Sequence, residues 1–228
     1  MEKVRQTARV GLRRLYLGLG FNGPADAVDV AFGLPRAENR VAGTFTALAD
    51  TGQGIHMKTE QKIVAVGVAV GVLTMALSVW ALTMILPIPS IADTSAERLV
   101  YALRANVVAI IPLVVMIVTV ANSRFFSEAI DPTRHVESRS LEIDGRAADN
   151  TLQQTFVFTV ASLALSTIVP LHQLQVVWAC VITFVAARMV FWFGYRLNPL
   201  YRAPGMSATA YLNLGMILFV VFDLLRGA

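Results

Sequence analysis

The chain has little charge. Asp, Glu, Lys and Arg make up 15% of its 228 residues, against about 25% in soluble domains. Hydrophobic residues make up 56%. A chain with this composition is expected to lie in a lipid bilayer, so we predict an integral membrane protein and expect no nucleic acid among its partners.

Cysteine and histidine are also scarce. Cys180 is the only cysteine and falls in an apolar run, which excludes a disulfide framework and a CxxC redox or zinc motif. The three histidines, His56, His135 and His172, lie far apart without ligand-spaced neighbours, so we predict no metal site. The HExxH, Walker and GxSxG motifs are absent from the sequence as well, so none of these enzyme signatures assigns a reaction.

Five long apolar runs are present. They are Ile63 to Leu86, Leu99 to Ala121, Asn150 to Val169, Leu174 to Tyr195 and Ala208 to Leu225. Each is long enough to cross a hydrocarbon core of about 30 Å as a helix, and none alternates like a barrel strand. The sequence therefore predicts an all-α membrane protein with five spans, the second kinked at Pro112.

Residues 1–56 differ from the rest of the chain. Their first stretch is basic, and the remainder is dominated by Gly, Ala, Thr and Asp with little periodicity. Two interpretations stay open: a disordered extension or basic arm, or a misassigned start with translation beginning at Met57. Residues 57–98 are then predicted to hold the first span and a short loop.

The cationic residues between the spans predict the orientation. One side holds Arg124, Arg134, Arg139, Arg146, Arg196 and Arg202 together with the nine Lys and Arg residues of the N-terminal region, or only Lys58 and Lys62 of these nine if the chain starts at Met57. The other side holds Arg98 and Arg226. Cytoplasmic loops are enriched in Lys and Arg. We therefore expect the N-terminus in the cytoplasm and the C-terminus outside, in a bacterial inner membrane or an internal eukaryotic membrane.

Polar residues mark the cytoplasmic ends of the third and fourth spans. Arg146, Asn150 and Gln153 stand at i, i+4 and i+7 and so share one helical stripe, and Arg188 and Tyr195 are seven residues apart on the next span. With Arg202 in the following loop, they predict a cation-rich pocket for an anionic ligand. The alternative is structural, with Arg188 paired to Asp149 or Asp223 of a neighbouring helix and with Asn150 and Gln153 joining helices by hydrogen bonds.

The same residues carry a family resemblance. The patterns Arg146-x-x-x-Asn150-x-Leu152-Gln153, Arg188 with Tyr195, and Arg202-Ala203-Pro204-Gly205 resemble the MAPEG family, the membrane-associated proteins in eicosanoid and glutathione metabolism. The resemblance covers about Leu99 to Leu225, so residues 99–228 would form a MAPEG-like four-helix domain preceded by one extra helix. Five spans, the run from Arg98 to Arg104, and Pro112 most resemble the mattrin branch.

The resemblance implies a homotrimer that holds glutathione between subunits near the cytoplasmic surface. Carried over by position, Arg188 and Tyr195 would be catalytic, and Arg146, Asn150, Gln153 and Arg202 would bind the ligand. Two positions depart from the family's pattern: Gln153 stands where many catalytic members have Glu, and Phe191 where some have His.

Two functions are implied by this resemblance. One is a glutathione-dependent transferase or peroxidase acting on lipophilic substrates in the bilayer. The other is a non-catalytic, mattrin-like membrane protein with a regulatory or trafficking role, whose pocket holds a lipid headgroup or only stabilises the trimer. A channel or transporter ranks third, because no charged residue lies near a bilayer midplane and no inverted repeat is evident.

Overall fold

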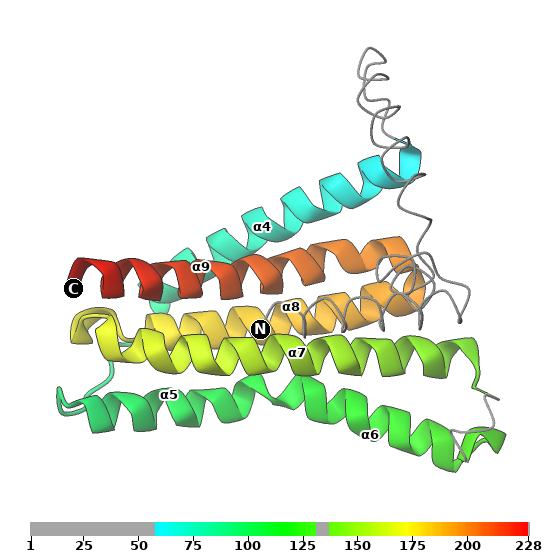
Figure 1. Cartoon of the computed structure of the whole chain (residues 1–228), viewed down its shortest axis with the longest axis horizontal. Helices are drawn as coiled ribbons and strands as arrows, with labels where there is room; N and C mark the ends of the chain where they lie inside the picture. The colour runs from blue at the N-terminus through cyan, green and yellow to red at the C-terminus, as the bar shows by residue number, and fades with distance from the viewer. Residues whose placement is uncertain (1–57, 131–136, 228) are drawn as a thin grey trace, which may run out of the picture. The chain divides into compact units, whose positions relative to one another are not determined.

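The computed structural model describes residues 58–130 and 137–227, and every long element in these ranges is a helix (Figure 1). The helices are α4 (Thr59–Ile85), α5 (Ser95–Ala109), α6 (Ile111–Phe125), α7 (Arg139–Ile168), α8 (Val176–Leu197) and α9 (Ala203–Gly227). With α5 and α6 counted together, the described residues contain five segments long and apolar enough to cross a membrane. The predicted all-α membrane protein is confirmed. The predictions for residues 1–56 lie outside the described residues.

The second span is interrupted next to Pro112, as predicted, with only Ile110 between α5 and α6. Proline has no N–H, so Pro112 cannot donate to the carbonyl of Val108 as an ordinary helical residue would. Helix α5 closes with the bond from Ile110 N–H to the Asn106 carbonyl, at 3.1 Å, and α6 starts with the bond from Val114 N–H to the Ile110 carbonyl, also at 3.1 Å. Pro112 occupies the first turn of α6, where its missing donor costs nothing.

Helix α7 begins at Arg139, well before the apolar run predicted to start the third span at Asn150. Ser138 caps the helix by accepting a hydrogen bond from Leu141 N–H at 3.3 Å. The polar connection from Asn122 to Arg146, whose mixed charges predict a solvated loop or a surface helix, is helical from Arg139 on. Hydropathy marks where a helix enters lipid, whereas capping decides where it starts. Likewise, α9 begins at Ala203 after the short 3-10 helix Pro199–Arg202, five residues before the predicted span.

Helix α8 is the centre of the bundle. It contacts α4, α5, α7 and α9, and in Figure 1 it runs between α7 and α9. Two fully buried phenylalanines join it to α7: the ring centroids of Phe158 and Phe184 are 4.3 Å apart. The core alanines Ala102, Ala105 and Ala109 lie on one side of α5 and are fully buried, which lets the α5 backbone approach its neighbours closely.

Helix α4 packs across α9 through glycines. Gly67 and Gly71 are one turn apart on α4, and Gly71 is buried. A Cβ added at Gly71 would lie 2.2 Å from the Pro204 carbonyl oxygen and 2.2 Å from Ser207 Oγ. The Ser207 hydroxyl also donates to the Val68 carbonyl at 3.3 Å. Small residues of this spacing allow close helix packing in membranes, and here they hold α4 against α9.

Arg98 ties the connection between α4 and α5 to the end of α7. Its guanidinium donates to the Val169 carbonyl at 2.5 Å and forms an ion pair with Asp93. The last carbonyls of a helix have no intrahelical donor and carry the negative end of the helix dipole. Arg98, which the sequence pattern used only for orientation and resemblance, is therefore a C-terminal cap of α7.

Candidate functional site

Helices α7 and α8 bring Asn150 and Arg188 together. Nη1 of Arg188 donates to Oδ1 of Asn150 at 3.0 Å, and the guanidinium lies 4.1 Å from the centroid of the Phe191 ring. The Arg188 side chain is completely buried, at 0% exposure. Its Nε and Nη2 atoms have no hydrogen-bond partner among the described residues. Arg188 is thus a buried cation, and two of its three nitrogens have no hydrogen-bond partner among the described residues.

Among the described residues Arg188 pairs with neither Asp149 nor Asp223, so that part of the structural alternative is wrong, but Asn150 does join α7 to α8 by a hydrogen bond. Within the ranges 58–130 and 137–227, no carboxylate forms an ion pair with Arg188, whose hydrogen-bond partner is the amide of Asn150. A guanidinium cannot lose its proton in a protein, and burying it without a counter-charge costs several kcal/mol. Such an arrangement is typical of functional positions in membrane helices.

Tyr195 and Arg202 form a second contact, nearer the end of α8. The Arg202 guanidinium lies 4.9 Å from the centroid of the Tyr195 ring. Tyr195 is 6% exposed, whereas Arg202 is exposed at the end of the short 3-10 helix before α9. Seven residues of helix separate Tyr195 from Arg188, a rise of about 10 Å. The two contacts therefore stand about two turns apart along α8.

Arg146 and Gln153 lie on the outer face of α7. Arg146 pairs with Glu142 at 2.6 Å, but both side chains are more than half exposed, so the pair contributes about 0–1 kcal/mol. Gln153 is exposed as well. Within one chain, the structure joins Asn150 to Arg188 and Tyr195 to Arg202, while Arg146 and Gln153 face away from the bundle. A single pocket lined by all six residues stays a prediction.

The most buried acidic residue near this end was missed by the sequence pattern. Asp144, 1% exposed, belongs to the polar connection whose mixed charges predict a solvated loop or a surface helix. Its carboxylate accepts from Nε1 of Trp192 at 2.8 Å and from Nε and Nη2 of Arg196 at 2.8 and 2.6 Å. The available signal was a helical stripe with Asp144 one turn before Ala148, continuing through Thr151 and Thr155, all buried.

Amide side chains also join helices deeper in the bundle. Asn106 of α5 donates to Ser162 of α7 at 2.9 Å. Asn213 of α9 donates to Gln154 of α7 at 2.9 Å. Bonds of this kind contribute about 0.6 kcal/mol each in membrane proteins. They are structural links, and they set Asn150 apart, because its partner Arg188 retains unpartnered donors.

A cavity of about 570 Å³ lies between α6 and α7 beside this region. Its lining residues are Ile117, Val120, Ala121, Arg124, Phe125, Gly145, Ala148 and Asp149. It includes none of the six residues predicted from the sequence. Among the described residues, no group of three His, Cys, Asp or Glu side chains lies close enough to hold a metal ion.

Five membrane spans around a buried arginine–asparagine contact define a multi-pass helical membrane protein with a polar centre. The MAPEG family model matches residues 101–222, from within α5 to within α9. The chain belongs to the MAPEG family. The match contains both Asn150 and Arg188 and leaves α4 outside. Comparison with curated proteins and with solved structures found no match.

Proposed function

We propose that this MAPEG protein binds glutathione beside Arg188 and transfers it to lipophilic electrophiles, or uses it to reduce lipophilic peroxides. The observation that carries the proposal is the fully buried Arg188, with one donor on Asn150 and two donors without a partner in the described part of the chain. An anionic group is the ligand that such a site favours. In the proposed orientation, the site lies toward the cytoplasm and the C-terminus lies outside.

The spacing of the residues suits a tripeptide. An extended tripeptide spans about 10 Å, which is also the rise between Arg188 and Tyr195. In this arrangement Arg188 stabilises the thiolate, which is the nucleophile and is a minor species for a free thiol of pKa about 8.5. Tyr195 assists through its hydroxyl. Asn150, at the edge of the exposed face of α7, orients the Arg188 guanidinium.

The chemistry of conjugation then needs no metal. The thiolate sulfur attacks the electrophilic carbon of the substrate, a carbon–sulfur bond forms, and the leaving group departs or the electron pair moves into the acceptor. Arg146 and Arg202 are available for the tripeptide carboxylates. Arg146 is held only by a weak exposed pair with Glu142, so a carboxylate can replace that partner at little cost.

We also propose that the protein is a homotrimer. Arg146, Asp149 and Gln153 are exposed on α7 at the level of the Asn150–Arg188 contact. Polar groups at this position are costly toward lipid, and a neighbouring copy would cover them. In nanodiscs, the mass of the protein that remains after subtracting the lipid and the scaffold protein should correspond to three copies of the chain. A mass that corresponds to one copy would contradict the homotrimer and any binding site completed by a neighbouring subunit.

Substitution of Arg188 by methionine tests the site. We expect Arg188→Met to weaken glutathione binding at least 100-fold in calorimetry on the protein in nanodiscs. The melting temperature should stay unchanged or rise, because replacing a buried ion by an apolar side chain is often neutral or stabilising. Loss of both binding and stability would indicate a structural arginine.

The matched control is Arg104→Met, which removes the same charge from an exposed position on α5. Its glutathione affinity should stay within twofold of the unmodified protein. Equal effects of the two substitutions, or no binding by the unmodified protein, would exclude the proposed site.

The second candidate is a non-catalytic, mattrin-like protein with a regulatory or trafficking role. The observation that favours it is Gln153, an amide where a carboxylate would pair with the glutathione amine, together with the complete burial of Arg188. Conjugation of glutathione to a lipophilic electrophile by the unmodified protein would support the enzyme. Binding without turnover, or neither, would support the non-catalytic protein.

A further inference from the structure

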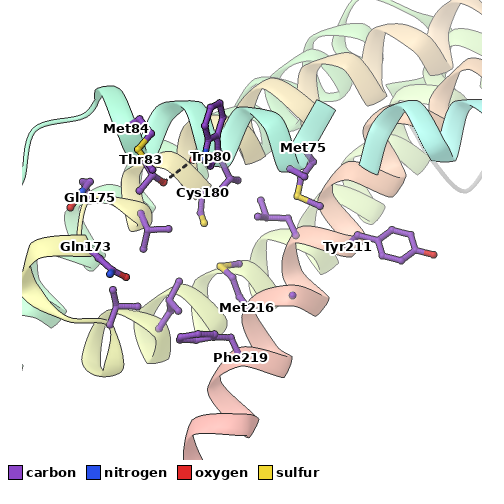
Figure 2. A pocket seen from close by; sticks show the side chains of 17 residues that line it. Met75, Trp80, Thr83, Met84, Gln173, Gln175, Cys180, Tyr211, Met216 and Phe219 are labelled. Atoms are coloured by element: carbon purple, nitrogen blue, oxygen red, sulfur yellow. Dashed lines mark hydrogen bonds between the residues drawn. The ribbon is translucent and has the colours of Figure 1, made fainter. Parts of the chain in front are cut away.

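A cavity of about 680 Å³ lies between α4 and the rest of the bundle (Figure 2). Its walls come from α4, the end of α7, the start of α8 and the middle of α9. Drug-sized ligands occupy cavities of about 300–1,000 Å³. This cavity is separate from the proposed glutathione site, because none of the six residues predicted for that site lines it.

The lining of the cavity is apolar along most of its length and polar at one end. Met75, Trp80 and Met216 belong to the apolar part, and methionine adapts its shape to flexible hydrocarbon. Gln173 and Gln175 lie together at the opposite end from Met75 in Figure 2. They belong to the connection between α7 and α8, which is at the membrane surface. The cavity therefore matches a lipid molecule whose apolar chain lies inside the bilayer and whose headgroup lies at the membrane surface.

The depth of the cavity matches one leaflet. On α4 its lining runs from Met75 to Met84, and on α9 from Tyr211 to Phe219. Eight or nine helical residues span about 12–13 Å, and half of a hydrocarbon core is about 15 Å. A single lipid chain entering at the glutamines would thus extend along the cavity to about the middle of the bilayer.

Gln175 indicates the headgroup chemistry. The residue is 8% exposed, and its Oε1 atom is buried with no donor among the described residues. An unpaired buried amide oxygen costs about 1–3 kcal/mol, which a hydroxyl donor would relieve. None of the lining residues is charged, so an ionic headgroup would be buried without a counter-charge.

From these observations we propose that the cavity is a binding site for a single-chain lipid with an uncharged hydroxyl headgroup, of which a monoacylglycerol is the simplest example. The hydroxyl donates to Gln175, and the chain lies between α4 and α9. Helix α4 forms one wall of this cavity and lies outside the residues that match the family model, so the site depends on the extra helix of this chain.

A photoreactive monoacylglycerol, with a diazirine near the end of its chain, tests the site in nanodiscs. We expect labelling to map to the inner parts of α4 and α9, near Met75 and Met216. Unlabelled monoacylglycerol should compete, whereas a fatty-acid methyl ester, which has no hydroxyl, should compete at least tenfold less well. Equal competition by the ester would exclude recognition of the hydroxyl, and even labelling of all lipid-facing helices would exclude a specific site.

Gly215 provides a variant that fills the cavity without disturbing the fold. It lines the cavity, and a Cβ added there would meet nothing within 4 Å. Gly215→Phe should lower the labelling at least tenfold, with an unchanged melting temperature and unchanged glutathione affinity. Gly227→Phe, at an equally open position on the same helix, should leave labelling intact. Undiminished labelling of Gly215→Phe would overturn the proposal.

Discussion

Replacing Arg196 by methionine is expected to lower the free energy of unfolding by about 3 kcal/mol, because it leaves the carboxylate of Asp144 buried without its ion pair. Asp144 is 1% exposed, and Arg196 supplies two of its three hydrogen bonds. For a domain of this size, the melting temperature should fall by about 6–12 °C. A thermal unfolding assay in detergent or nanodiscs measures the change.

The partner substitution separates charge from packing. If the loss in Arg196→Met comes from the unpaired carboxylate, the double variant Asp144→Asn with Arg196→Met should recover most of the stability, since the neutral amide can still accept from Trp192. Arg146→Met serves as the control, because its pair with Glu142 is exposed and contributes little. If Arg146→Met lowers the melting temperature as much as Arg196→Met does, loss of any positive charge at this end of the protein explains the destabilisation, and the buried pair with Asp144 does not.

Replacing Gly71 by leucine should displace α4 from α9. The first added carbon would fall 2.2 Å from both the Pro204 carbonyl oxygen and Ser207 Oγ, and the Pro204 contact is backbone that cannot rotate away. Overpacking of this kind costs about 1–3 kcal/mol and sometimes more. We therefore expect a lower melting temperature and loss of monoacylglycerol labelling, because α4 forms one wall of the cavity.

The same substitution tests whether the remaining helices form an independent unit. The residues that match the MAPEG model begin after α4, so Gly71→Leu should retain glutathione binding within about threefold. Gly227→Leu is the matched control, since it adds the same side chain at a glycine that has open space around it and does not line the cavity. Unchanged stability and labelling in Gly71→Leu would contradict the close α4–α9 contact.

Several features of the site were predictable from sequence patterns. The positions of Asn150 and Arg188 near the same ends of consecutive antiparallel spans were enough to predict that they approach each other, and the structure joins them by a hydrogen bond. Tyr195 and Arg202 were grouped for the same reason and are in contact. These predictions succeeded because a helical rise and a short connection leave little freedom in which residues meet.

The partners of individual polar groups were less predictable. Asp149 was considered a partner for Arg188 because it carries a charge, but the helix rotation that buries Ala148 and Thr151 leaves Asp149 exposed. Asp144, which the charge pattern places in a solvated loop or on a surface helix, is buried for the same reason. The sequence shows only that a charged side chain favours contact with water or with an opposite charge. Packing sets the rotation of the helix, and this rotation decides whether the side chain faces water or another helix.

The sequence by itself determined that the protein lies in a lipid bilayer, that it has five spans and which family it belongs to. Hydropathy over about twenty residues and a set of spaced polar residues are properties of the chain alone. Only the tertiary structure decided that α4 rests on α9 through Gly71, that Asp144 is buried beside Arg196, and that a cavity opens beside Gln175. Each of these depends on how closely two backbones approach, and that distance is the result of packing by residues far apart in the chain.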